Sequence, residues 1–114
     1  MKRDVLVVLY DGVQGLSFSG PIETFSAGSA ADGHGPGPVY EIRTASVGGA
    51  PVRTSGGLTV VPDGSLEDAL PAHTLVIPRD SQFPGRGGQL AGVVGELADA
   101  AGRVAAISTG VFLL

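Results

Sequence analysis

The chain has 114 residues, 43% of them hydrophobic, which is too apolar for a disordered protein and suits one domain or most of one. The sequence contains seven Lys or Arg and eleven Asp or Glu, which gives a formal net charge of −4. Because its longest basic run is Lys2-Arg3, we expect no nucleic-acid binding by this segment itself. No cysteine is present, which excludes disulfides, thiolate metal sites and a cysteine nucleophile.

The first predicted element is a strand over residues 4–10, because a continuous run of β-favouring side chains is typical of a strand buried on both faces of a parallel sheet. Asp11-Gly12 ends it as a turn. A helix is predicted to begin at Gly20-Pro21, since proline suits the first helical position and Glu23 would then complement the positive end of the helix dipole. Residues 31–38 are rich in Gly and Pro and predict a surface loop.

The middle of the chain predicts short β elements. A second strand is expected over residues 39–47. Residues 52–54 and 58–61, separated by Ser55-Gly56-Gly57, predict a small hairpin at the edge of the sheet. Residues 65–68 resemble a capping box and predict the start of a short helix.

The last third predicts a strand over residues 74–77, a helix over 89–101 from its spacing of apolar residues, and a strand that runs into Ser108. Thr109-Gly110 then opens what we expect to be another helix. The alternation of strands and helices is that of a doubly wound α/β sheet. Ligands in such sheets bind beyond the carboxyl ends of the strands, so we expect segments 11–19, 78–88 and 108–110 to converge on a pocket.

The sequence gives no sign of a membrane protein or a secreted one. Its apolar segments fall well short of the roughly 20 residues that a membrane span requires. The N-terminus lacks the apolar region and cleavage site of a secretory signal. We therefore expect a cytoplasmic protein with no membrane partner.

Five stretches carry a resemblance to a known superfamily: residues 7–25, 40–48, 55–60, 75–78 and 106–114. Together they are similar to the PfpI superfamily, whose fold resembles that of class I glutamine amidotransferases and which includes intracellular proteases, deglycases and isonitrile hydratases. In particular they resemble the N-terminal domain of AraC-type transcriptional regulators. The resemblance implies a flavodoxin-like three-layer sandwich with a mainly parallel sheet. Residues 1–114 would be a partial domain, without its C-terminal part and without any helix-turn-helix domain.

The chain departs from the pattern expected of the superfamily's enzymes. They are expected to have an acidic residue after the first strand, a Gly-Gly pair after the central strand and its proline, a cysteine at the strand-to-helix turn, and a histidine farther downstream. The corresponding residues here are Ser17, Arg79-Asp80 and Ser108, and the region that would supply the histidine lies beyond residue 114.

These departures argue against covalent catalysis. A thiol with a pKa of about 8.5 can be ionised by a helix N-terminus, whereas a serine hydroxyl needs a general base within hydrogen-bond reach. His34 lies in the Gly- and Pro-rich loop, and His73 precedes a strand at the end away from the expected pocket. Side chains at Arg79-Asp80 would also occupy the place where backbone N–H groups approach an oxyanion.

Each candidate residue has a simpler alternative. Ser108 is interpreted as a helix cap, a ligand hydrogen-bonding group or a nucleophile. Ser17 is a pocket-rim hydroxyl or a loop residue. Arg79 and Asp80 either pair with each other on the surface or bind an anionic effector. Asp11 and Asp63, each before glycine, are interpreted as turn residues.

The resulting hypothesis is a non-catalytic, effector-sensing domain of an AraC-type regulator. Its small polar pocket would be lined by the following residues: Ser17, Arg79, Asp80, Ser108 and Thr109. A small-molecule effector would shift the geometry of a homodimer, and DNA would be contacted by a C-terminal domain outside this sequence. No metal or cofactor is expected, since the sequence has no metal-ligand cluster, phosphate loop or dinucleotide fingerprint.

Two other functions remain open. One is a PfpI-superfamily hydrolase or isonitrile-hydratase-like enzyme with Ser108 in the nucleophile position. The other is a degenerate remnant that dimerises through an exposed sheet edge. Sequence beyond residue 114 would distinguish the enzyme from the regulator. A histidine there favours the enzyme, and helix-turn-helix patterns favour the regulator.

Overall fold

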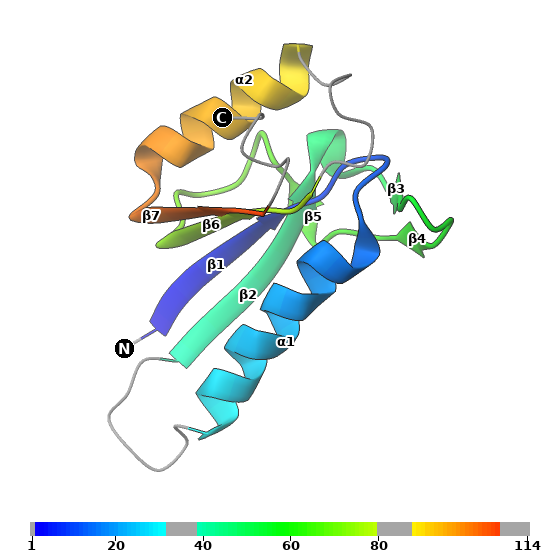
Figure 1. The fold of residues 1–114 in the computed structure, drawn as a ribbon. Helices are drawn as coiled ribbons and strands as arrows, with labels where there is room; N and C mark the ends of the chain where they lie inside the picture. The colour runs from blue at the N-terminus through cyan, green and yellow to red at the C-terminus, as the bar shows by residue number, and fades with distance from the viewer. Residues whose placement is uncertain (1, 32–38, 80–87, 108–114) are drawn as a thin grey trace.

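Five parallel strands form a single sheet in the order β5-β2-β1-β6-β7 in the computed structural model, which describes residues 2–31, 39–79 and 88–107 (Figure 1). The strands are β1 (Lys2–Val8), β2 (Val39–Ser46), β5 (Gly64–Ser65), β6 (Thr74–Ile77) and β7 (Arg103–Ala106). The predicted parallel sheet is confirmed. The strand predicted over residues 4–10 is shifted toward the N-terminus and ends at Val8, although Leu9 N still donates to Ala45 O of β2 at 2.8 Å.

Helices α1 (Gly15–Ala31) and α2 (Gly88–Ala100) lie on opposite faces of this sheet (Figure 1). The connection from β1 through α1 leads to β2, on one side of β1 in the sheet. The connection from β6 through α2 leads to β7, toward the opposite edge of the sheet. Because both crossovers take the preferred right hand, their helices fall on opposite faces. The predicted three-layer sandwich is confirmed.

The centre of the core is the pair β1 and β6. Val5 pairs with Thr74 and Val7 with Val76, and every residue of β6 is buried. From Val5 onward, β1 is apolar on both faces because a helix layer covers each face, whereas its first residues are charged. Strand order reverses between β1 and β6, so this pair is the topological switch point of the sheet.

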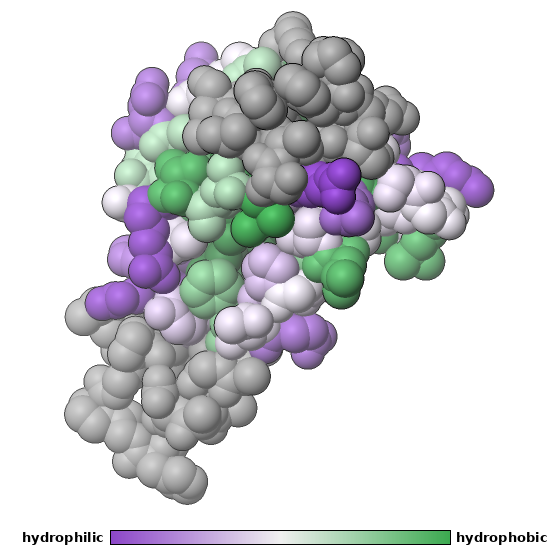
Figure 2. Space-filling view, in the orientation of Figure 1, coloured by the Kyte–Doolittle hydropathy of each residue, from purple (hydrophilic) through white to green (hydrophobic). Residues whose placement is uncertain are grey.

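Strand β7 is less covered than β6. Arg103 and Val104 are exposed, and Ala105 and Ala106 are only partly buried. Figure 2 shows apolar side chains among hydrophilic ones on the visible face of the molecule. The degree of burial therefore falls from the centre of the sheet toward this edge.

Helix α1 begins earlier than predicted, at Gly15, and Pro21 lies inside it. An interior proline removes a backbone hydrogen bond and costs about 3 kcal/mol. The first turn nevertheless buries Ser17 and Phe18, each 8% exposed, and this burial offsets the cost. Glu23 consequently lies in the middle of the helix rather than in its first turn, so the predicted interaction with the dipole is wrong.

The helix predicted after Ser65 is also wrong, although its capping hydrogen bonds form. Ser65 Oγ donates to Asp68 Oδ2 at 2.8 Å and accepts from Asp68 N at 3.2 Å. The backbone follows β2 instead, because Leu66 N donates to Ser46 O at 2.8 Å and the Leu66 side chain is 1% exposed. Strand pairing and burial of Leu66 outweigh the local capping signal, and the segment is a turn.

The predicted hairpin exists, as β3 (Val52–Arg53) and β4 (Thr59–Val60), but it forms a separate two-stranded antiparallel sheet rather than an edge of the main one. A short 3₁₀ helix, η1 (Val47–Gly49), precedes it. Backbone hydrogen bonds from Gly12 N to Arg53 O (2.8 Å) and from Ser55 N to Val13 O (3.0 Å) attach the hairpin to the loop after β1. Within the described ranges, neither helix has the length and apolar content that crossing a bilayer requires.

Candidate functional site

The loops that follow β1 and β6 are tied together at the switch point. Arg79 N donates to Ser17 Oγ at 3.0 Å, and Ser17 Oγ donates to Gln14 O at 2.8 Å. Gln14 N donates in turn to Arg79 O at 3.2 Å. The expected convergence of these two segments is therefore observed, and it runs through the Arg79 main chain.

A second contact joins the same loops. Tyr10 OH donates to Pro78 O at 2.5 Å, and Tyr10 is 4% exposed. Pro78 directly follows β6, and Tyr10 follows β1. Two side chains of the first loop, Tyr10 as a donor and Ser17 as an acceptor, thus bind the main chain of the second loop and fix the carboxyl ends of the two central strands to each other.

The structure places only part of the predicted site. Ser17 is a buried residue in the first turn of α1, not a loop residue, and the Arg79 side chain is exposed. The other three predicted ligand-binding residues, Asp80, Ser108 and Thr109, lie outside the described residues, as does His34. The proposed Arg79–Asp80 pair and the role of Ser108 therefore stay predictions.

His73 lies at the amino end of β6, away from these loops, as expected. Its Nδ1 is 2.9 Å from Thr74 Oγ1, which also accepts a hydrogen bond from Arg103 Nε at 2.7 Å. Asp63 is a turn residue, as predicted: its Oδ2 accepts from Thr44 N at 2.8 Å. Both side chains serve local structure.

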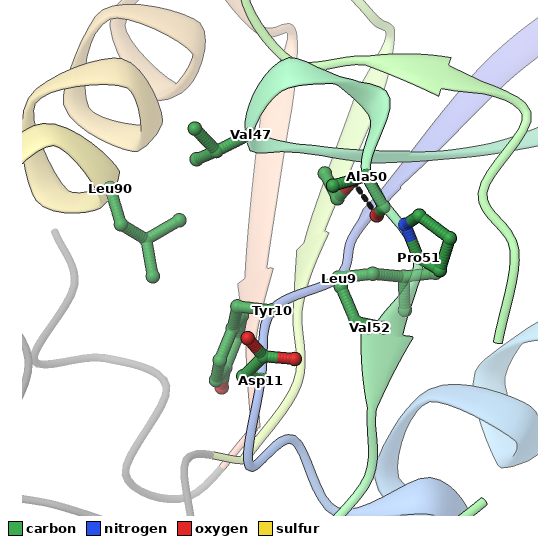
Figure 3. A pocket seen from close by; sticks show the side chains of 9 residues that line it. Leu9, Tyr10, Asp11, Val47, Ala50, Pro51, Val52 and Leu90 are labelled. Carbon is green, nitrogen blue, oxygen red and sulfur yellow. Dashed lines mark hydrogen bonds between the residues drawn. The ribbon is translucent and has the colours of Figure 1, made fainter. Parts of the chain in front are cut away.

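A cavity of about 190 Å³ opens beyond the carboxyl ends of β1 and β2 (Figure 3). Its walls come from the loop after β1, from η1 and the residues that precede β3, and from the first turn of α2. The lining residues are Leu9, Tyr10, Asp11, Ser46, Val47, Ala50, Pro51, Val52 and Leu90. Ser17 and Arg79, the two predicted site residues that the structure describes, are not among them.

Among the described lining residues, six are apolar and three have polar side chains. Asp11 Oδ1 accepts from Arg53 N at 2.9 Å, which ties the cavity wall to the hairpin. Ser46, 2% exposed, donates its hydroxyl proton to Ala50 O at 2.6 Å. Tyr10 donates to Pro78 O, as described above. Few polar groups in an apolar cleft is the usual composition of a small-molecule site.

The sequence held a signal for one of these residues. Asp11 was interpreted as a turn residue, which is correct, but it also falls in the segment expected to face a ligand. The positions of Ala50 and Leu90 had no such signal, because they meet only after η1 and α2 pack over the strand ends. Among residues 2–31, 39–79 and 88–107, no group of three or more His, Cys, Asp or Glu side chains could hold a metal ion.

Comparison with known proteins gives consistent matches. A model of the DJ-1/PfpI family matches residues 3–114. A Streptomyces lividans protein from the cpoL 5′ region is 38% identical over 112 residues, which cover 96% of this chain and 76% of that protein.

Two solved structures show the same fold. One is a ThiJ/PfpI family protein from Pseudomonas syringae, with a TM-score of 0.80 and 15% identity, of which the chain covers 45%. The other is an AraC family transcriptional regulator from Pseudomonas putida, with a TM-score of 0.66 and 17% identity, of which it covers 68%. The matches cover 100% and 97% of this chain, respectively. This chain spans less than half of the length of the Pseudomonas syringae protein.

Proposed function

The chain belongs to the DJ-1/PfpI family, and we propose that it is the non-catalytic, effector-sensing part of an AraC-type transcriptional regulator. In this proposal a small molecule binds at the carboxyl ends of the central strands and leaves unchanged. The ligand site comprises the cavity beside Tyr10 and Asp11 together with the predicted Ser17, Arg79, Asp80, Ser108 and Thr109.

The observation that carries the proposal is the hydrogen bonding of Ser17. The resemblance to the family's enzymes implies an acidic residue at this place, able to hold or move a proton. The Ser17 hydroxyl instead donates to Gln14 O and accepts from Arg79 N, so it holds two loops together. An uncharged hydroxyl committed in both directions supplies neither an acid nor a base to a neighbouring serine.

The cavity supports recognition of a small molecule. It lies at the strand ends where open α/β sheets bind ligands, and apolar walls enclose a few polar groups. Since its walls come from three separate parts of the chain, a ligand would hold the loop after β1, η1 and α2 in one arrangement. We propose that this ordering changes the geometry of a homodimer, while DNA is contacted elsewhere, because the net charge here is −4.

A ligand screen with two readouts tests the proposal. Compounds of up to roughly twelve heavy atoms, a size suited to a cavity below the usual 300 Å³ of drug sites, are screened by thermal melting and then recovered for mass analysis. We expect some to raise the melting temperature and to be recovered unchanged. Ala50→Leu, which enlarges a side chain of the lining, should abolish the rise, and Leu58→Ala in the hairpin should not.

The contradicting result is chemical conversion. If bound compounds are recovered as hydrolysed or hydrated products, and if Ser108→Ala stops the conversion, the protein is an enzyme that uses Ser108. If no compound raises the melting temperature of the wild type, the sensing role is wrong.

A further inference from the structure

We propose that the cavity beside Asp11 binds a compact primary ammonium compound, with its charged head at Asp11 and a small apolar body against Leu9, Val47 and Leu90. This inference rests on the proposed sensing function and gives the chemical class of the ligand. It follows from the charge, the hydrogen-bonding direction and the size of the cavity.

The charge of the described lining is negative, and Asp11, which carries it, is exposed to solvent. Asp11 is the only ionisable carboxylate or basic residue among the described lining residues. Arg53 binds Asp11 through its backbone N–H, which donates to Asp11 Oδ1. The Nη2 atom of the Arg53 guanidinium lies beside Gly57 in the hairpin turn. Within the described part of the chain, the second carboxylate oxygen of Asp11 accepts no hydrogen bond. An anionic ligand would be repelled here and a cation attracted.

The hydrogen-bonding direction of the lining points the same way. Ser46 Oγ has already donated its proton to Ala50 O, and Tyr10 OH has donated its own to Pro78 O. Asp11 is an acceptor by chemistry. The polar side chains among the described lining residues therefore have no spare proton to donate, while Asp11 and Ser46 can still accept. A ligand that donates N–H groups matches this arrangement, and a carboxylate or phosphate does not.

The apolar walls and the volume limit the rest of the ligand. Figure 3 shows the Tyr10 ring beside the Asp11 carboxylate, with Val47 and Leu90 pointing toward the space near them. A cation close to an aromatic face gains a further attraction. The volume of about 190 Å³ is somewhat larger than the roughly 150 Å³ cavity that holds benzene, so the ligand has roughly six to ten heavy atoms.

Isothermal titration with three matched probes tests the inference. Benzylammonium, benzyl alcohol and benzoate have similar size and differ in charge. We expect benzylammonium to bind tighter than benzyl alcohol by on the order of tenfold, and benzoate not to bind. Equal binding of the cation and the alcohol, or the absence of any binding, would overturn the ligand class.

Substitutions locate the effect. Asp11→Asn keeps an oxygen to accept from Arg53 N and removes the charge, so it should lower benzylammonium affinity by on the order of tenfold and leave benzyl alcohol unchanged. Asp4→Asn is the control, because it makes the same charge change at an exposed residue near the other end of β1. A thermal melt of each variant confirms that it is folded.

The outcomes separate the two proposals. If Asp11→Asn has no effect but Ala50→Leu abolishes binding of all probes, the cavity senses ligands of another class, and only the ammonium inference fails. If Ala50→Leu also leaves binding unchanged, the cavity is not the site, and the proposed location of sensing fails with it.

Discussion

Arg79 N donates to Ser17 Oγ at 3.0 Å across a sequence separation of 62 residues, and this hydrogen bond joins the loop after β1 to the loop after β6. Tyr10 OH and Pro78 O make a second connection between the same loops. Together these bonds fix the carboxyl ends of the two central strands, which form one side of the candidate site. Rigid support of this kind is what a recognition site needs to hold its lining residues in place.

The first prediction concerns Ser17. Ser17→Ala removes the acceptor for Arg79 N and leaves that part-buried donor without its partner, so the free energy of unfolding should fall by about 1–3 kcal/mol. Urea denaturation followed by circular dichroism measures the change. Ser26→Ala, at an exposed position of the same helix, is the control and should change stability by less than about 0.5 kcal/mol. Equal effects of the two substitutions would show that the bond carries no stability.

The second prediction uses two glycines. A Cβ at Gly102 would lie 2.9 Å from His73 O, so Gly102→Ala presses a side-chain carbon against a backbone oxygen and should destabilise the protein by about 1–3 kcal/mol. At Gly95, in α2, a Cβ meets nothing within 4 Å, and Gly95→Ala should stabilise by about 0.5–1 kcal/mol because alanine favours helix. Thermal melting of both variants checks the opposite signs. A stabilising Gly102→Ala would mean that β7 does not approach β6 as described.

The third prediction concerns the core. Leu75 is 0% exposed in the centre of the sheet, so Leu75→Ala should lower the free energy of unfolding by about 2–5 kcal/mol. Leu70 is 73% exposed, and Leu70→Ala should change it by no more than about 0.5 kcal/mol. Guanidinium denaturation of the pair provides the measurement. Similar losses in both variants would contradict the placement of β6 at the centre.

The sequence predicted the central sheet well, for a physical reason. A strand segment covered on both faces must be apolar, and β1 from Val5 onward and β6 from Leu75 onward are such segments. The right-handed crossover then leaves little choice of layer for α1 and α2. The convergence of Ser17 with Arg79 followed from the same rule, since carboxyl ends of parallel strands meet at one edge.

Local signals failed where tertiary packing was stronger. Pro21 suggested a helix start, but burial of Phe18 extends the helix toward the N-terminus. Ser65 formed its capping bonds with Asp68 in a turn, because Leu66 continues the pairing with β2. The sequence predicted a pocket at the carboxyl ends of the strands, with Asp11 in a segment facing it. It could not predict Ala50 and Leu90 as lining residues, because they are remote in sequence and meet only through the packing of η1 and α2.

Intact-mass spectrometry under denaturing conditions tests the central claim, recognition without covalent chemistry, most directly. Wild-type protein and Ser108→Ala are each incubated with an alkyl isonitrile and with an activated ester, and their masses are compared. We expect the two proteins to gain no adduct that distinguishes them. An added mass on the wild type that is absent from Ser108→Ala and maps to Ser108 would contradict the claim.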